Sequence, residues 1–196
     1  MSQAPFSPYW CWEEAVPHDI CDRIVELHQK SEWKEGSNAT LGEDKVNNSY
    51  RNVDVCFSNN TWINAMVYGY IQYANSQNFG YELSEHDREL AQISRYVKNQ
   101  FYKRHQDFGP NRNNDSILRK LSLTLQLSNS DDYEGGDMVF LTDGLDVDGD
   151  PTMTASRTKG SIIVFESKLI HEVTPVTSGT RYSLVKWVQG NNRFSY

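Results

Sequence analysis

The heptapeptide Leu121-Ser122-Leu123-Thr124-Leu125-Gln126-Leu127 alternates strictly between leucine and a polar residue. Successive side chains of a β-strand point to opposite faces, so this pattern predicts a strand with all its leucines on one face. The leucine face is expected to pack against apolar residues. Alternation alone leaves open whether the face with Ser122, Thr124 and Gln126 lines a cavity or meets solvent.

The sequence around this strand contains further short strand-like stretches separated by Gly, Asn and Asp residues. We predict strands at residues 91–97, 100–106, 119–127, 137–141, 154–158, 161–165, 171–175 and 181–188. Towards the N-terminus, apolar residues recur at helical spacing in residues 17–33 and 61–75, the second helix being capped by Ser58 or Thr61. A strand at residues 50–57 lies between these helices. Many short strands after two helices are typical of a closed or two-sheet β architecture with helices on one outer face.

Length and composition narrow the class of protein. A chain of 196 residues with 38% hydrophobic content fits one domain, residues 1–196. Its net charge of -7 disfavours a nucleic-acid partner, which usually meets a basic surface. The sequence has neither a membrane-length apolar run nor a signal-peptide pattern, so we expect a soluble cytoplasmic or otherwise intracellular protein. The three cysteines lack metal-type spacing and are expected to be free thiols.

His105-Gln106-Asp107 is the first candidate for chemistry. On an extended segment, residues two apart project from the same face, which sets an imidazole beside a carboxylate. Such a triplet is common by chance and needs a third ligand to form a metal site. His171, which follows the apolar stretch 161–165, is the natural third ligand.

Arg181 lies ten residues after His171, between Gly179-Thr180 and an alternating strand. An arginine that points inward from such a strand is costly unless it faces an anion, and a carboxylate ligand satisfies it with a two-pronged hydrogen bond. Two histidines and one carboxylate leave three positions of an octahedral Fe(II) open, as O2 activation requires.

The order His-x-Asp, distal His, then Arg at plus ten resembles the Fe(II)/2-oxoglutarate-dependent dioxygenases, in particular the prolyl 4-hydroxylase-like group with its PKHD-type hydroxylases. Matching pieces run from Arg95 to Gln189 and include the Tyr133-Glu134-Gly135-Gly136-Asp137 run. The resemblance implies a mainly β fold, a double-stranded β-helix (jelly roll, cupin-like), with N-terminal helices packed on the major sheet. Residues 1–89 then supply helical support and a substrate-side loop at residues 36–48, and residues 90–196 supply the β-helix core.

Carried over position by position, the resemblance implies roles for individual residues. His105, Asp107 and His171 hold Fe(II), while Arg181 and Tyr96 bind one carboxylate of 2-oxoglutarate. The residues expected to meet the substrate are Trp187, Tyr102, Arg51 and Asp54. The implied cofactors are Fe(II), 2-oxoglutarate and O2, with ascorbate as a possible reductant.

The reaction implied is hydroxylation of a peptidyl proline to 4-hydroxyproline, with release of succinate and CO2. The partner is then a proline-containing protein or peptide, and neither nucleic acid nor membrane is expected. Three alternatives stay open. The oxygenase acts on another side chain or a small molecule; the chain is a non-catalytic jelly-roll binding module; or the same ligands hold zinc in a hydrolase, which leaves Arg181 without a role.

Overall fold

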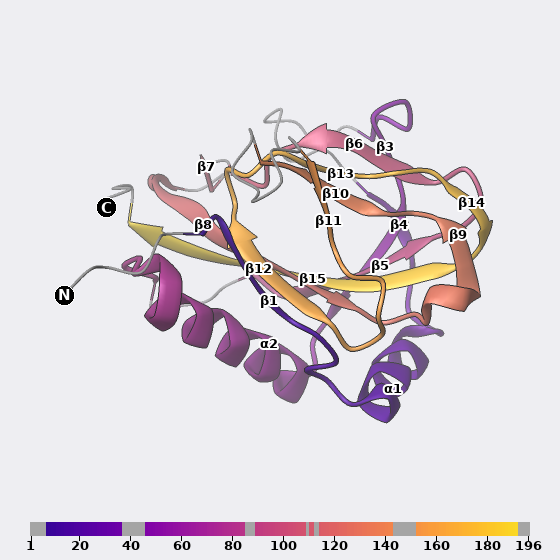
Figure 1. Ribbon diagram of the computed structural model, residues 1–196, viewed down its shortest axis with the longest axis horizontal. Helices are drawn as coiled ribbons and strands as arrows, with labels where there is room; N and C mark the ends of the chain where they lie inside the picture. Colours follow the sequence, from indigo (N-terminus) through magenta and orange to yellow (C-terminus); the bar gives the residue numbers. More distant parts are fainter. Residues whose placement is uncertain are drawn as a thin grey trace.

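The computed structural model describes residues 7–36, 46–84, 89–108, 110–111, 114–142 and 152–191. Most of the loop predicted at residues 36–48 lies outside these ranges. The described chain forms two antiparallel sheets that face each other, with two helices against the outer side of the larger one (Figure 1).

The larger sheet has the strand order β1-β12-β8-β15-β5-β4-β2, with β7 paired to β8. Its strands are β1 (Tyr9–Trp12), β2 (Lys34–Glu35), β4 (Asp54–Ser58), β5 (Ala91–Tyr96), β7 (Pro110–Asn111), β8 (Asn114–Gln126), β12 (Ile162–Glu166) and β15 (Arg181–Asn191). The smaller sheet has the order β11-β10-β13-β6-β3. Its strands are β3 (Arg51–Asn52), β6 (Phe101–His105), β10 (Met138–Leu141), β11 (Thr152–Thr154) and β13 (His171–Val173).

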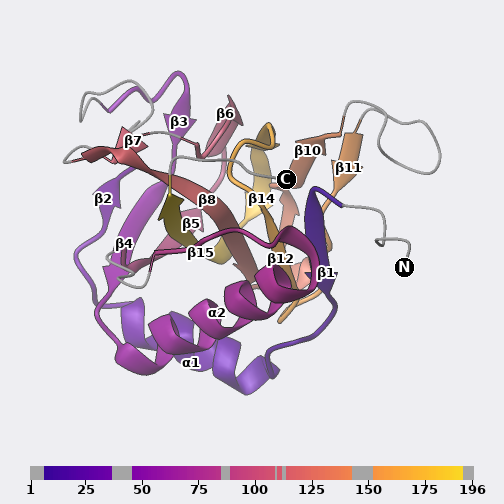
Figure 2. The same cartoon turned by 90° about the vertical axis from the view of Figure 1, so that its left-hand side faces the viewer.

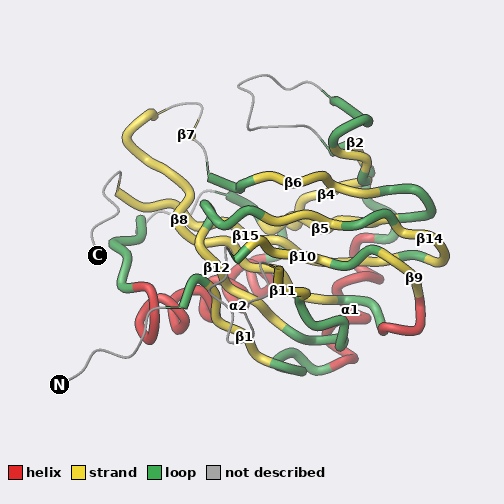
Figure 3. Tube along the Cα trace, turned by 45° about the horizontal axis from the view of Figure 1, so that its top comes forward, coloured by secondary structure: helices red, strands yellow, loops and turns green. Residues whose placement is uncertain are grey.

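A short ladder of β9 (Tyr133–Gly135) with β14 (Val176–Gly179) joins the two sheets at one end, after the 3-10 turn η3 (Ser130–Asp132). This arrangement is the double-stranded β-helix, or jelly roll, that the sequence predicted. In Figure 3 most strands run alongside one another across the view, with the helices below them.

The helices α1 (His18–His28) and α2 (Thr61–Ala74) cover the outer face of the larger sheet (Figure 2). Ile24 of α1 and the buried stripe Ile63, Val67 and Ile71 of α2 pack into the main core beside the leucines of β8. Helical stability in such elements comes mainly from burying this apolar face. No helix in the described part of the chain has the length and apolarity needed to cross a membrane.

The neighbours of β8 show where each of its two faces lies. Leu121, Leu123 and Leu125 are fully buried against the helices. Ser122 and Thr124 lie opposite Phe165 and Ile163 of β12, which pack against β10 of the smaller sheet. The polar face of β8 is therefore inside the β-helix and not at the solvent.

Several predicted boundaries were wrong for identifiable reasons. Neither Ser58 nor Thr61 caps α2; the cap position is Asn60, without a side-chain cap bond, and the helix continues into the π-turn η2 (Asn75–Phe79). The strand expected at residues 154–158 is instead β11 at Thr152–Thr154. Arg157 leaves the strand to donate hydrogen bonds to Asp137 and to the carbonyls of Gly135 and Tyr133. The edge strands β1 and β2 were not predicted, because pairing with distant strands defines them.

Gly135 occupies a position that only glycine fits. Its φ is +67°, and a Cβ there would lie 2.2 Å from the carbonyl oxygen of Pro175. We expect Gly135→Ala to lower the free energy of unfolding by at least about 2 kcal/mol, because left-handed backbone and the clash both oppose it.

Urea unfolding of Gly135→Ala beside Gly69→Ala measures this effect. Gly69 lies in α2 with nothing within 4 Å of its would-be Cβ. The same substitution there is expected to stabilise by about 0.5–1 kcal/mol. A Gly135→Ala protein as stable as the parent would contradict the assigned backbone conformation.

Candidate metal centre

Two neighbouring strands of the smaller sheet bring the predicted histidines together. His105 ends β6 and His171 begins β13, and their Cα atoms are partners in the antiparallel ladder. Residues directly opposite in such a ladder have neighbouring side chains. The two imidazole rings lie 4.1 Å apart between centroids, and both residues are buried.

Backbone carbonyls fix the orientation of both rings. Nδ1 of His105 lies 2.8 Å from the carbonyl oxygen of Lys103, and Nδ1 of His171 lies 2.9 Å from that of Leu169. A carbonyl only accepts, so each Nδ1 is the protonated nitrogen. Each Nε2 is left with a free lone pair for a metal, the usual arrangement of histidine ligands.

Asp107 completes the cluster from the bend just after β6. One carboxylate oxygen lies 3.7 Å from Nε2 of His105, and the other lies 3.6 Å from Nε2 of His171. One ligand atom from each residue falls within 4.8 Å of the others. This donor set, two imidazoles and one carboxylate, fits Fe(II) with open coordination positions.

The electrostatics of the cluster favour the forms that bind a metal. Burial, together with His171, lowers the pKa of His105 to about 3, so its ring is neutral at neutral pH. Burial raises the pKa of Asp107, but His171, His105, Arg119 and the Trp187 indole outweigh it and keep the pKa below its usual value. Neutral imidazole and ionised carboxylate are the ligand forms that metals require.

Arg181 starts β15 and faces the interior of the β-helix. Only 3% of its surface is exposed, and no ion pair to it is formed by the residues that the structure describes. Tyr96 of β5 is its partner in the ladder, with the Tyr96 ring centroid 5.5 Å from the guanidinium carbon. Burial raises the pKa of Tyr96, so its hydroxyl remains a hydrogen-bond donor. The pair presents donors to an anion from two adjacent strands.

Three of the four residues predicted to meet the substrate lie close to this cluster. Tyr102 stacks on the His105 ring with 3.4 Å between centroids, and Arg51 covers the Tyr102 ring at 4.6 Å. Trp187 is buried near Asp107. Asp54 is not brought to the site. It pairs with Arg95 at 2.8 Å, on the face of the larger sheet opposite to Tyr96.

Arg119 was not predicted as a site residue, but its guanidinium lies 4.1 Å from the Trp187 ring and near Asp107. A register shift between Val188 and Gln189 places Arg119 opposite Gln189 and skips Lys120. Such a bulge turns a side chain to the other face of its strand. Glu89 accepts hydrogen bonds from Arg119 at 2.9 and 3.0 Å and from Gln189 at 2.8 Å. These three residues form one hydrogen-bonded group beside Trp187.

Fold and site together define a double-stranded β-helix that carries a two-histidine, one-carboxylate cluster with a buried arginine nearby. The family model of the 2OG-Fe(II) oxygenase superfamily matches residues 91–189, which contain all of these residues. The chain belongs to this superfamily. Fe(II), 2-oxoglutarate and O2 are the cofactors that the family implies.

Curated relatives place the chain near one group of the superfamily. It is 35% identical over 100 residues to a PKHD-type hydroxylase of Alteromonas mediterranea, a match that covers 50% of this chain and 42% of the relative. A PKHD-type hydroxylase of Idiomarina loihiensis is 33% identical over 101 residues, covering 50% and 40%. The match thus spans about two fifths of the length of these relatives.

Solved structures resemble the whole described fold. A Pseudomonas putida prolyl-4-hydroxylase superposes with a TM-score of 0.69 at 18% identity, covering 92% of this chain and 91% of the other. A Trichoplax adhaerens prolyl hydroxylase in complex with a hypoxia inducible factor peptide fragment gives a TM-score of 0.70 at 18% identity, covering 92% and 83%. At this identity the likeness establishes the jelly-roll fold.

Proposed function

We propose that this chain hydroxylates a peptidyl proline to 4-hydroxyproline, with Fe(II), 2-oxoglutarate and O2 as cofactors and with succinate and CO2 as products. The observation that carries the proposal is the buried His105, Asp107 and His171 cluster, with both imidazoles oriented by carbonyls, inside the same β-helix as Arg181. Arg181 is a buried cation without an ion pair among the described residues. A dicarboxylate that also reaches the metal is the ligand that uses both features.

In this proposal the iron, with 2-oxoglutarate and O2, supplies the oxidant, and the chain holds and aims it. His105, Asp107 and His171 bind the metal through two Nε2 atoms and a carboxylate oxygen. Arg181 and the Tyr96 hydroxyl donate hydrogen bonds to the distal carboxylate of the 2-oxo acid. The role of ascorbate as a reductant stays a prediction.

Support for a prolyl substrate comes from two sides. The relatives and solved structures named above include prolyl hydroxylases, one of them bound to a peptide. Beside the cluster lie two aromatic side chains, Trp187 and Tyr102, the residue type that commonly contacts a proline ring.

One observation favours a second candidate, a substrate that carries a carboxylate. A guanidinium group lies over each aromatic ring of the site: Arg51 over Tyr102, and Arg119, which Glu89 already pairs, over Trp187. Arg51 is buried, and arginine is the residue of choice for binding a carboxylate in a planar, two-pronged manner. An acidic side chain or a free amino acid fits this feature better than an internal proline does.

Anaerobic titration of 2-oxoglutarate into the Fe(II)-loaded protein, followed by its visible charge-transfer band, tests the oxygenase. Admitting O2 with two peptide libraries, one rich in proline and one rich in acidic residues, then tests the substrate. Gain of one oxygen on proline supports the proposal, and gain on an acidic residue supports the second candidate. Zn(II)-loaded protein is the control, because Zn(II) has no redox chemistry. A folded, iron-loaded protein without the band contradicts both candidates and favours a binding module.

Trp187→Phe distinguishes an effect on the peptide substrate from an effect on 2-oxoglutarate binding. We expect it to lower kcat/KM for a proline peptide by about tenfold, because the smaller ring loses contact area with the substrate. The dissociation constant of 2-oxoglutarate, measured by the band, is expected to stay unchanged. Equal kcat/KM values for the two proteins would remove Trp187 from the substrate site.

A further inference from the structure

A cavity of about 140 Å³ runs from Arg181 to the surface on a side that the function described above does not use. By this measure a single water molecule needs about 10–15 Å³, so the cavity has room for several. Its lining includes the buried Thr124 and Gln126 next to Arg181, and the exposed Cys11 and Thr154 at the other end. None of His105, Asp107 and His171 lines it.

The cavity opens between two strands, β1 and β11, that are not partners in a ladder of the described chain. β1 is the last strand of the larger sheet and β11 the last strand of the smaller one. Figure 2 shows both strands on the right-hand side of the molecule, but they belong to different sheets. Cys11 comes from β1 and Thr154 from β11, so the opening lies between the edges of two sheets, as far as the described strands define them.

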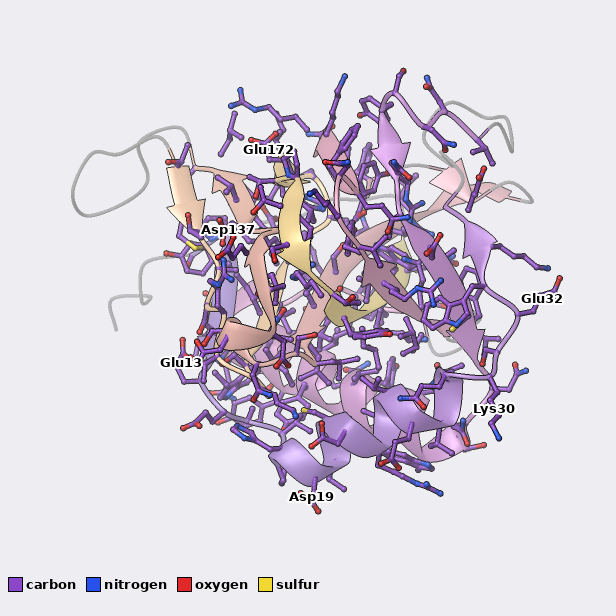
Figure 4. All side chains as sticks on the ribbon, turned by 90° about the vertical axis from the view of Figure 1, so that its right-hand side faces the viewer. Glu13, Asp19, Lys30, Glu32, Asp137 and Glu172 are labelled. Carbon is purple, nitrogen blue, oxygen red and sulfur yellow. The ribbon has the colours of Figure 1, made fainter. Side chains whose placement is uncertain are left out.

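The walls are mostly apolar, and the charges lie at the two ends. Trp12, Met138, Met153 and Ile163 supply the apolar surface. Arg181 is the cation at the inner end. Glu13, at the surface in Figure 4, is the anion at the outer end, where its carboxylate accepts hydrogen bonds from Ser156 at 2.7 Å and Ser161 at 2.9 Å.

We propose that this cavity is a rear entrance, through which a 2-oxo dicarboxylate reaches Arg181 and its shorter dicarboxylate product leaves. The inference rests on the proposed function, because it requires that Arg181 bind the cosubstrate. It adds that exchange of the cosubstrate proceeds from the open edge between β1 and β11. Exchange is then independent of the face on which Trp187 and Tyr102 receive the substrate.

A plugged entrance has a kinetic signature that a damaged site lacks. An obstacle in the path slows association and dissociation by the same factor and leaves the dissociation constant unchanged. Damage to Arg181 instead raises the dissociation constant. Stopped-flow measurement of the anaerobic charge-transfer band with Fe(II)-loaded protein gives both rate constants.

Cys11→Trp fills the opening from β1. Cys11→Ser is the control at the same position, because serine is close to the parent cysteine in size. Thr154→Trp fills the opening from β11. It tests the same path if Cys11→Trp fails to fold. We expect both tryptophan variants to lower the two rate constants by at least about fivefold, with an unchanged dissociation constant. Cys11→Ser is expected to behave like the parent.

Glu13→Gln tests the path without added bulk. Removing a negative charge beside the path of a dianion raises its association rate, and added salt reduces the difference. We expect association with Glu13→Gln to be about two- to threefold faster at low salt. The glutamine oxygen still accepts a hydrogen bond from Ser156 or Ser161.

Unchanged rate constants in both tryptophan variants would overturn the rear entrance, as would a raised dissociation constant with unchanged dissociation rate. Failure of the proposed function looks different. The parent protein then gives no charge-transfer band at all, whereas failure of the entrance leaves the band intact and its kinetics insensitive to Cys11, Thr154 and Glu13.

Discussion

His171→Ala is expected to weaken Fe(II) binding by more than about 100-fold, since even the loss of groups that only orient a ligand costs 10–100-fold. His171 supplies one of the three donors, and its Nδ1 is already committed to the carbonyl of Leu169. Isothermal titration of Fe(II) under argon measures the change directly. The cosubstrate also loses affinity, because in the proposed site it binds through the metal.

Phe140→Leu is the matched control for this variant. Phe140 packs against the His171 ring at 5.7 Å between centroids, but it carries no donor atom. We expect it to cost stability while keeping the metal. Near-parental Fe(II) affinity in folded His171→Ala would remove His171 from the ligand set.

Arg181→Ala is expected to raise the dissociation constant of 2-oxoglutarate by about 100-fold or more and to leave Fe(II) binding unchanged. Each hydrogen bond to a charged group contributes about 1.5–3 kcal/mol, and a two-pronged contact contains two of them. Arg181→Lys keeps the charge without the fork and is expected to fall between the alanine variant and the parent. Normal 2-oxoglutarate binding by Arg181→Ala would show that another residue holds the distal carboxylate.

Arg181→Ala is expected to weaken ligand binding but not to weaken the stability of the ligand-free protein. Arg181 is buried without an ion pair among the described residues, so its charge is desolvated and uncompensated in the ligand-free protein. We expect ligand-free Arg181→Ala to unfold at the same temperature as the parent or at a higher one. If Arg181 served stability alone, its replacement by alanine would lower the unfolding temperature strongly.

The strands and the metal cluster were predictable because their signals are local. Alternation in residues 121–127 depends only on the two-residue period of a strand, and β8 has its leucines on one face as predicted. His105 and Asp107 are close together in sequence, so a bend after β6 suffices to bring them together. His171 was predicted from its place after an apolar stretch, and the pairing of β13 with β6 brings it opposite His105.

The substrate side was less predictable, because faces and registers depend on strands that are far apart in sequence. Asp54 was expected to meet the substrate, as Arg51 was, yet the pairing of β4 with β5 places it beside Arg95 on the other face of the sheet. Arg119 reaches Trp187 only because the ladder slips at Val188 and Gln189.

By itself, then, the sequence determined the fold class, the order of the main strands, and the residue types able to hold a metal and an anion. It did so because side-chain alternation and short spacings are properties of a single strand. Only the tertiary structure decided which face each side chain occupies, that Arg119 joins the site, and that a cavity connects Arg181 to the surface. Those features arise from the register between strands and from where the edges of the two sheets lie, which no single segment of the chain encodes.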